Sequence, residues 1–168
     1  MPVGYQSTNG AKIAQKSCRF TLTANQTLTA GTNNILDFDL ATTNNSTSTF
    51  VNNGAGRVTV TEAGVYLITA GVVVTSQIGA ISNVSTAIFR NAQVVANISD
   101  RATLSVNDSI GQTTSTIIEL AANDIIDVRC LVNQVVNGVG NGLANAAGQL
   151  LGSNAVQVNH LGITKLER

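Results

Sequence analysis

The segment from Arg57 to Val74 constrains the fold of this chain more than any other part of the sequence. It begins with Arg57-Val-Thr-Val-Thr, where polar and apolar side chains alternate, and Glu62-Ala-Gly then interrupts the pattern. An apolar, β-branched run follows from Val65 to Val74. Alternation, a short break containing glycine and a β-branched run together predict two consecutive β-strands joined by a tight turn.

Strand-like segments recur along the rest of the chain at short spacing, and no long stretch has helical periodicity. Many short strands separated by polar turns are typical of antiparallel sandwiches and jelly rolls. We therefore predict an all-β fold, an antiparallel jelly-roll sandwich of about ten strands. The predicted strands lie near residues 18–23, 35–40, 50–51, 58–60, 64–74, 82–90, 93–98, 101–106, 112–120, 125–134 and 155–166, with loops at 25–34 and 42–49.

The chain divides into an arm and one domain. Residues 1–15 are polar, contain two glycines and the only proline, and are predicted to form an N-terminal arm that is ordered only where a neighbour holds it. Residues 16–168 are predicted to be a single jelly-roll domain, large enough to bury a core without a disulfide. An uncharged insertion of Gly, Ala, Asn and Leu interrupts it at about 137–153. We expect this insertion to pack on a neighbouring chain; a loose hairpin tip is the alternative.

Charged residues are sparse and balanced, with nine Lys plus Arg against nine Asp plus Glu, 11% of the chain. Ordinary domains carry about 25%. A net charge of zero provides no long-range field to attract nucleic acid or an anionic membrane, so neither is predicted as a partner. Low charge favours association between copies, although a monomer with a polar, uncharged surface is the alternative. The first residues do not resemble a signal peptide, and no apolar stretch reaches the ~20 residues of a membrane span, so we expect synthesis in a cytoplasm.

The sequence offers few residues for chemistry. Cys18 and Cys130 lie in predicted strands, and in a reducing compartment they are predicted to be buried free thiols. A disulfide between the first strand and a late strand is the alternative. The only histidine, His160, has no nucleophile elbow near it. Asp37 and Asp39 favour solvated or arginine-paired carboxylates over a calcium site. We therefore predict no enzymatic activity, no cofactor and no metal.

Four segments, in order, resemble one known family. Residues 50–74, with Gly64 and Tyr66, resemble "F-x-V-x-x-A-G-V-Y-x-F" of the complement 1q globular heads, the jelly rolls related to tumour necrosis factor. Residues 87–96 resemble its hairpin, with Ala92 in place of glycine. Residues 117–128 resemble its "L-x-x-G-D-x-V-x-V" segment, with Asn123 in place of glycine, and asparagine tolerates positive φ. The end of the chain resembles the family's terminal strand without its Phe.

The resemblance covers residues 20–166 and implies a trimer that binds other molecules and does not catalyse. Only 4% of residues are aromatic, and no collagen stalk precedes the domain in this sequence. The chain therefore looks most like a stalkless phage capsid decoration (cement) protein. For packing in the core or between subunits, we expect Phe50, Tyr66, Val128, Leu131 and Leu166.

By this analogy, we predict a homotrimeric, non-enzymatic virion structural protein that stabilises or decorates the head. Its partners would be itself and the major capsid protein or another virion protein. It would be made in the host cytoplasm and located on the capsid surface. The alternative is the receptor- or glycan-binding head of a fibre or spore-surface protein. The residues expected to contact the particle are Tyr5, Lys12, Leu143, Leu150 and Leu151.

Overall fold

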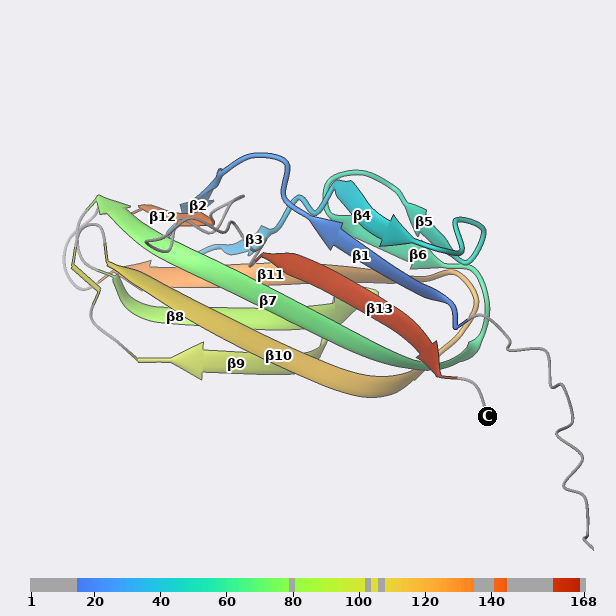
Figure 1. Cartoon of the computed structure of the whole chain (residues 1–168). Helices are drawn as coiled ribbons and strands as arrows, with labels where there is room; N and C mark the ends of the chain where they lie inside the picture. The colour runs from blue at the N-terminus through green and yellow to red at the C-terminus, as the bar shows by residue number, and fades with distance from the viewer. Residues whose placement is uncertain are drawn as a thin grey trace, which may run out of the picture.

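In the computed structural model, two antiparallel β-sheets face each other across an apolar core (Figure 1). The structure describes residues 15–78, 81–101, 104–105, 108–134, 141–144 and 159–166, with the backbone alone at 77, 78, 134 and 141–144. These residues form thirteen strands and no helix. The predicted all-β jelly-roll architecture is confirmed.

The first sheet has the order β2-β12-β7-β13-β1-β4, and β10 pairs with the other edge of β7. Its strands are β1 (Ser17–Thr21), β2 (Gln26–Thr29), β4 (Leu40–Asn44), β7 (Gly64–Ile78), β10 (Ser109–Leu120), β12 (Asn141–Ala144) and β13 (His160–Leu166). The second sheet has the order β5-β6-β11-β8-β9, with β3 also paired to β11. Its strands are β3 (Asn33–Ile35), β5 (Phe50–Asn52), β6 (Arg57–Val60), β8 (Ile81–Arg90), β9 (Gln93–Asp100) and β11 (Asp124–Gln134).

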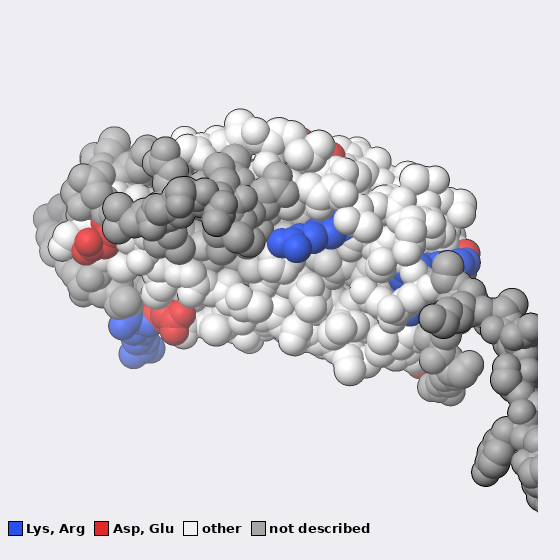
Figure 2. All heavy atoms as spheres, viewed as in Figure 1, with Lys and Arg blue, Asp and Glu red and all other residues white. Residues whose placement is uncertain are grey.

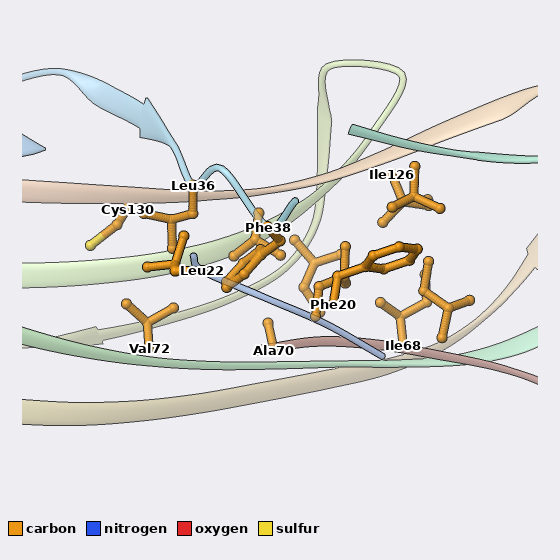
Figure 3. Packing of buried hydrophobic residues seen from close by; sticks show 14 of the residues in the cluster. Phe20, Leu22, Leu36, Phe38, Ile68, Ala70, Val72, Ile126 and Cys130 are labelled. Carbon is orange, nitrogen blue, oxygen red and sulfur yellow. The ribbon is translucent and has the colours of Figure 1, made fainter. Parts of the chain in front are cut away.

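The core forms between the inner faces of the two sheets. Along β7, alternate side chains from Tyr66 to Val74 are almost fully buried, as the period of a strand requires. Figure 3 shows Ile68, Ala70 and Val72 of this strand facing residues of the second sheet such as Cys130. Each fully buried large aliphatic or aromatic side chain contributes roughly 1.5–3 kcal/mol of transfer free energy. Of the two strands predicted at Arg57–Val74, β7 is therefore a central strand of the first sheet, whereas β6 lies in the second sheet next to the edge strand β5.

Two of the predicted tight turns are confirmed in their backbone conformation. Asn91 and Ala92 connect β8 to β9, and both have positive φ, 48° and 64°. Two consecutive positive φ angles match the twist of a two-residue hairpin. Asn123 precedes β11 and has a φ of 71°, the conformation that asparagine tolerates better than most residues.

The strand boundaries differ from the prediction mainly at polar, exposed segments. The predicted loop at 25–34 contains β2 and most of β3, and the predicted loop at 42–49 contains the end of β4. Residues 36–39, which the sequence predicts to belong to a strand, lie between β3 and β4. Residues 101–106 contribute one isolated bridge, from Leu104 to Ile81, and no strand in their described part. β4 is an edge strand with mostly exposed residues, so neither alternation nor apolar content marks it as a strand.

Part of the 137–153 insertion belongs to the sandwich. Residues 141–144 form β12, which pairs with β7 on one side and β2 on the other. The insertion predicted to interrupt the domain and pack on a neighbouring chain is therefore, at these four residues, a strand of the first sheet. Asn159 lies where β13 ends short of β12: its carboxamide accepts a hydrogen bond from Val73 N and donates one to Val73 O, 3.5 Å away. It continues the hydrogen bonding along β7 across the gap between the two strands.

Both ends of the described chain lie at one end of the sandwich, because β1 and β13 are antiparallel neighbours. We call this end, with the turns at 61–63, 91–92 and 121–123, the base. Glu62 accepts hydrogen bonds there from Lys16, from Lys165 at 2.8 Å and from Thr49 at 2.8 Å. These charge-assisted bonds lower the pKa of Glu62 to about 2. One carboxylate thus ties the first strand, the last strand and the turn before β7 together.

Candidate assembly surface

The outer face of the first sheet carries an apolar patch that the core does not use. The side chains of β7 that alternate with its core residues include Val65 and Leu67, which point away from the second sheet. In the strand register, Leu67 lies opposite Ile117 of β10, and Val65 lies opposite Leu166 of β13. Opposite residues of neighbouring strands are in side-chain contact range. We call these four residues the outer patch.

The outer patch is accessible in the described part of the chain. Ile117 is 65% exposed, whereas Val65, Leu67 and Leu166 are half-buried. Figure 2 shows this face in the same view as Figure 1, and charged side chains are few there, lying mainly toward the ends of the molecule with one cation near the middle. Along the outward side of β10, Glu119 is the charged residue. Glu119 lies opposite Val65 in the strand register, so the outer patch is apolar with one carboxylate at its margin. An apolar patch rimmed by polar residues marks an interaction surface more often than a solvated face.

One side of the sandwich also presents two open strand edges. β10 has twelve residues, and among the described residues it pairs only with β7. β9 pairs only with β8 among the same residues, and its Val94 is 54% exposed. Each of these strands contains one charged residue, Glu119 and Asp100. Long edges with few charges are templates for association unless something covers them.

The opposite side of the sandwich is closed by asparagine side chains. Asn44 of β4 donates a hydrogen bond to the carbonyl of Phe50 in β5 at 3.1 Å. Asn52 of β5 donates a hydrogen bond to the carbonyl of Asp39 at 3.1 Å. These bonds link the two sheets at their edges and occupy carbonyl groups that an approaching strand would need. The two sides of the sandwich are therefore not equivalent as association surfaces.

The outer face of the second sheet carries ion pairs. Arg129 donates two hydrogen bonds to Asp127, at 2.7 Å and 3.1 Å, and its guanidinium lies 4.0 Å from the centre of the Phe89 ring. The bond to Asp127 raises the pKa of Arg129. Arg57 lies opposite Asp127 and is exposed. Arginine-paired carboxylates are thus found here and at Arg90–Asp124, where the two charged groups are 2.8 Å apart.

Three of the five predicted packing residues lie in the core. Phe50, Tyr66 and Val128 are buried, and the rings of Phe50 and Tyr66 make an edge-to-face contact with centroids 6.2 Å apart. Leu131 is half-buried and faces away from the core, between the inward-facing Cys130 and Val132. Leu166 belongs to the outer patch. The other three patch residues, Val65, Leu67 and Ile117, are not among the residues predicted from the sequence. For Val65 and Leu67 the signal was the apolar content of both faces of the Val65–Val74 run, since strands covered on both faces read as continuous apolar runs.

The predicted particle-contact residues are mostly outside the described residues, namely Tyr5, Lys12, Leu150 and Leu151. Leu143 lies in β12, where the structure describes the backbone only.

The groups that could carry chemistry are placed as follows. Cys18 and Cys130 are both free and buried, which confirms the prediction of two unbridged thiols. Burial raises the pKa of each thiol to about 12, so both are protonated and poorly nucleophilic near neutral pH. Within the described residues, no group of three or more His, Cys, Asp or Glu side chains could hold a metal ion. No helix there has the length and apolar character needed to cross a membrane.

A shallow depression lies at the base, with a volume of about 410 Å³ and a lining of Ala63, Arg90, Glu119, Leu120 and Ala121. Its arginine already pairs with Asp124 and donates a hydrogen bond to the Glu119 carbonyl at 3.3 Å. The arrangement is that of a turn held by an ion pair.

Comparisons with known proteins support the fold alone. No protein-family model matches the chain. No curated protein matches it in sequence. Among solved structures, it is similar to Eiger TNF from S. frugiperda, with a TM-score of 0.66 and 14% identity over 91% of this chain and 93% of that one. It is also similar to murine APRIL, with a TM-score of 0.61 and 13% identity over 90% of this chain and 99% of that one. The chain therefore has a jelly-roll fold of the tumour necrosis factor type.

Proposed function

We propose that this protein is a non-enzymatic homotrimer that assembles through the outer face of its first sheet and decorates a larger particle. The outer patch carries the proposal, because it places exposed Ile117 beside Val65, Leu67 and Leu166 on a face with few charges. Threefold order is inferred from the resemblance to complement 1q and tumour necrosis factor jelly rolls. A stable interface of this kind should bury on the order of 2,000 Å² in total.

The particle is proposed to be a viral capsid, with the major capsid protein or another virion protein as partner. The net charge of zero and the low charge content favour association with other protein surfaces over nucleic acid or anionic membranes. The charged outer face of the second sheet, with its ion pair Asp127–Arg129, would then be the solvated side of each subunit. In this proposal the protein is made in the host cytoplasm and resides on the capsid surface.

The assembly proposal is tested by placing a charge in the outer patch. Ile117→Lys should convert the trimer to monomers, because three buried ammonium groups would lose their hydration at the interface. Val51→Lys is the matched control, since Val51 is an exposed apolar residue, 40% exposed, on an edge strand of the second sheet. Sedimentation should give about three times the chain mass of 17.3 kDa for the parent and the control. A monomeric parent, or a trimeric Ile117→Lys variant, would contradict this surface.

The decoration proposal is tested separately by particle binding. Deleting residues 1–15 should leave the trimer intact and weaken its attachment to capsids, since the arm carries the predicted contacts Tyr5 and Lys12. Co-sedimentation with purified capsids measures attachment. Equal attachment of both forms would assign docking to another surface. Binding to glycans but not to capsids would favour the alternative, a receptor- or glycan-binding head.

A further inference from the structure

The turn between β5 and β6 contains an asparagine followed by glycine in an exposed position. Asn53 and Gly54 are both exposed, and a Cβ atom built on Gly54 would have no neighbour within 4 Å. The three residues after Asn53, residues 54–56, all have positive φ. Glycine at this position removes the side chain that would otherwise shield the backbone nitrogen from the preceding carboxamide.

We propose that Asn53 is a site of spontaneous conversion to aspartate and isoaspartate. The backbone nitrogen of Gly54 attacks Cγ of Asn53, and the new N–C bond replaces the Cγ–Nδ2 bond. The nitrogen of Gly54 loses its proton, and Nδ2 of Asn53 takes up a proton and leaves as ammonia, so that a cyclic imide containing Cγ joins the two residues. Water, the co-reactant, then opens the imide at one of its two carbonyl carbons. Opening gives aspartate or its β-linked isomer, with no oxidation or reduction.

In the folded turn, the carboxamide of Asn53 and the backbone nitrogen of Gly54 each donate a hydrogen bond to a side chain. Asn53 Nδ2 donates to Thr59 Oγ1 at 2.6 Å, so the leaving nitrogen lies beside a hydroxyl group. The nitrogen of Gly54 donates to Asn52 Oδ1 at 2.8 Å, and this bond must break for the attack. Both partners are side chains at the surface, and surface loops open at low free-energy cost. The reaction therefore requires only local opening of the turn.

A second Asn-Gly pair in the same chain provides an internal comparison. Asn141 and Gly142 lie in β12, whose backbone is paired with β2 on one side and β7 on the other. A strand that is hydrogen-bonded on both edges cannot rotate its backbone toward the preceding carboxamide without losing those bonds. Conversion at Asn141 should therefore be slower than at Asn53. Two more Asn-Gly pairs, at residues 9–10 and 137–138, lie outside the described residues.

Conversion would place a new negative charge in a turn whose neighbouring residues contact the backbone of residues 36–39. Asn52 binds the backbone of Asp39, and Gly56 lies against the backbone of Leu36 and Asp37. An aspartate at position 53 is ionised at neutral pH. The net charge of the chain would change from zero to minus one. The β-linked isomer would also lengthen the backbone of the turn and disturb the hydrogen bond from Asn53 N to Arg57 O, 2.9 Å long in this structure.

The test is an incubation of the intact protein at mildly alkaline pH and 37 °C, followed by site-resolved peptide mapping and isoelectric focusing. Aspartate and isoaspartate should accumulate at residue 53 sooner than at residue 141. Isoelectric focusing should show a new band at a lower pH than the band of the parent protein. Asn53→Gln is the matched variant, because its longer side chain forms the corresponding ring far more slowly. In this variant the acidic band should be weaker, and peptide mapping should show no aspartate or isoaspartate at residue 53. Retention of the carboxamide at Asn53, or faster conversion at Asn141, would overturn the proposal.

Discussion

Tyr66 combines the largest buried side chain of the core with a polar contact at the base. Its ring is fully buried against Phe50, and its hydroxyl donates a hydrogen bond to the carbonyl of Glu62 at 2.7 Å. Burial, with the charge of Glu62 as a smaller cause, raises the pKa of Tyr66 to about 12. The phenol is therefore neutral near physiological pH, and it acts as a hydrogen-bond donor.

Two substitutions separate these contributions of Tyr66. Tyr66→Ala should lower the free energy of unfolding by about 3–5 kcal/mol, because it leaves a cavity in the core. Tyr66→Phe keeps the ring and should lower it by about 1 kcal/mol, the net value of one hydrogen bond. Denaturant unfolding measures both. Equal losses for the two variants would mean that the ring packing contributes little.

Glu62 should make stability depend on pH in the acid range. Its pKa falls from an ordinary value of 4.5 to about 2 in the folded protein, through the bonds from Lys16, Lys165 and Thr49. A carboxyl group with a lowered folded-state pKa stabilises the fold fully above its unfolded-state pKa, and this stabilisation is lost as pH falls through the folded-state value. Glu62→Gln should therefore flatten the decline of the unfolding free energy between these two pH values.

The control for this experiment is Glu119→Gln, because Glu119 is exposed and its carboxylate forms no ion pair among the described residues. The control should retain the acid-dependent decline of the parent. A Glu62→Gln profile that overlays the parent profile would contradict a stabilising role for this cluster.

The β5–β6 connection shows how a short element depends on one glycine. Gly56 has a φ of 71°, and a Cβ atom at this residue would lie 1.9 Å from the carbonyl oxygen of Leu36. The backbone of this turn therefore packs directly on the backbone that precedes β4. No L-residue with a side chain fits without moving one of the two segments.

A pair of glycine substitutions in this turn isolates the steric contact. Gly54 has a similar φ of 76° but open space around its Cβ position. Gly54→Ala should lower the free energy of unfolding by about 1–2 kcal/mol, because alanine disfavours a positive φ even where its side chain has room. Gly56→Ala should cost at least 1 kcal/mol more, because overpacking adds roughly 1–3 kcal/mol. Thermal or denaturant unfolding of both variants gives the difference in unfolding free energy. Equal losses would show that the backbone at Leu36 moves away from the added methyl group at little cost.

At the scale of the whole molecule, the two thiols report on global unfolding. Cys18 lies in the first sheet and Cys130 in the second, and both face the shared core. Burial raises both pKa values to about 12, which suppresses the reactive thiolate as well as access to it. The native protein should therefore resist alkylation near neutral pH.

Alkylation followed by mass spectrometry checks this expectation. Two labels should appear after denaturation without reductant, and none within the same time under native conditions. The labelling rate of the two sites should rise together with denaturant, because both require the sheets to separate. Absence of labels in the denatured, unreduced protein would instead indicate a disulfide.

Much of this fold can be predicted from the sequence because its signals are local. Alternating side chains identify the central strands, and Asn91-Ala92 and Asn123 identify turns whose φ angles are positive in the structure. The burial of Tyr66 and of both thiols also follows from their place in predicted strands. These features depend on residues close in sequence, where strand period and turn chemistry act directly.

Only the tertiary structure decides which distant residues meet. The outer patch joins β7, β10 and β13, and Glu62 bonds to Lys16 and Lys165, residues 46 and 103 positions away. The polar edge strand β4 exists because a neighbouring strand supplies its hydrogen bonds, and the short β12 exists because it is paired on both sides, whatever the composition of either strand. The sequence alone thus determines an all-β chain with a particular core, whereas strand pairing across the folded sandwich determines its edges, its closed side and its candidate assembly surface.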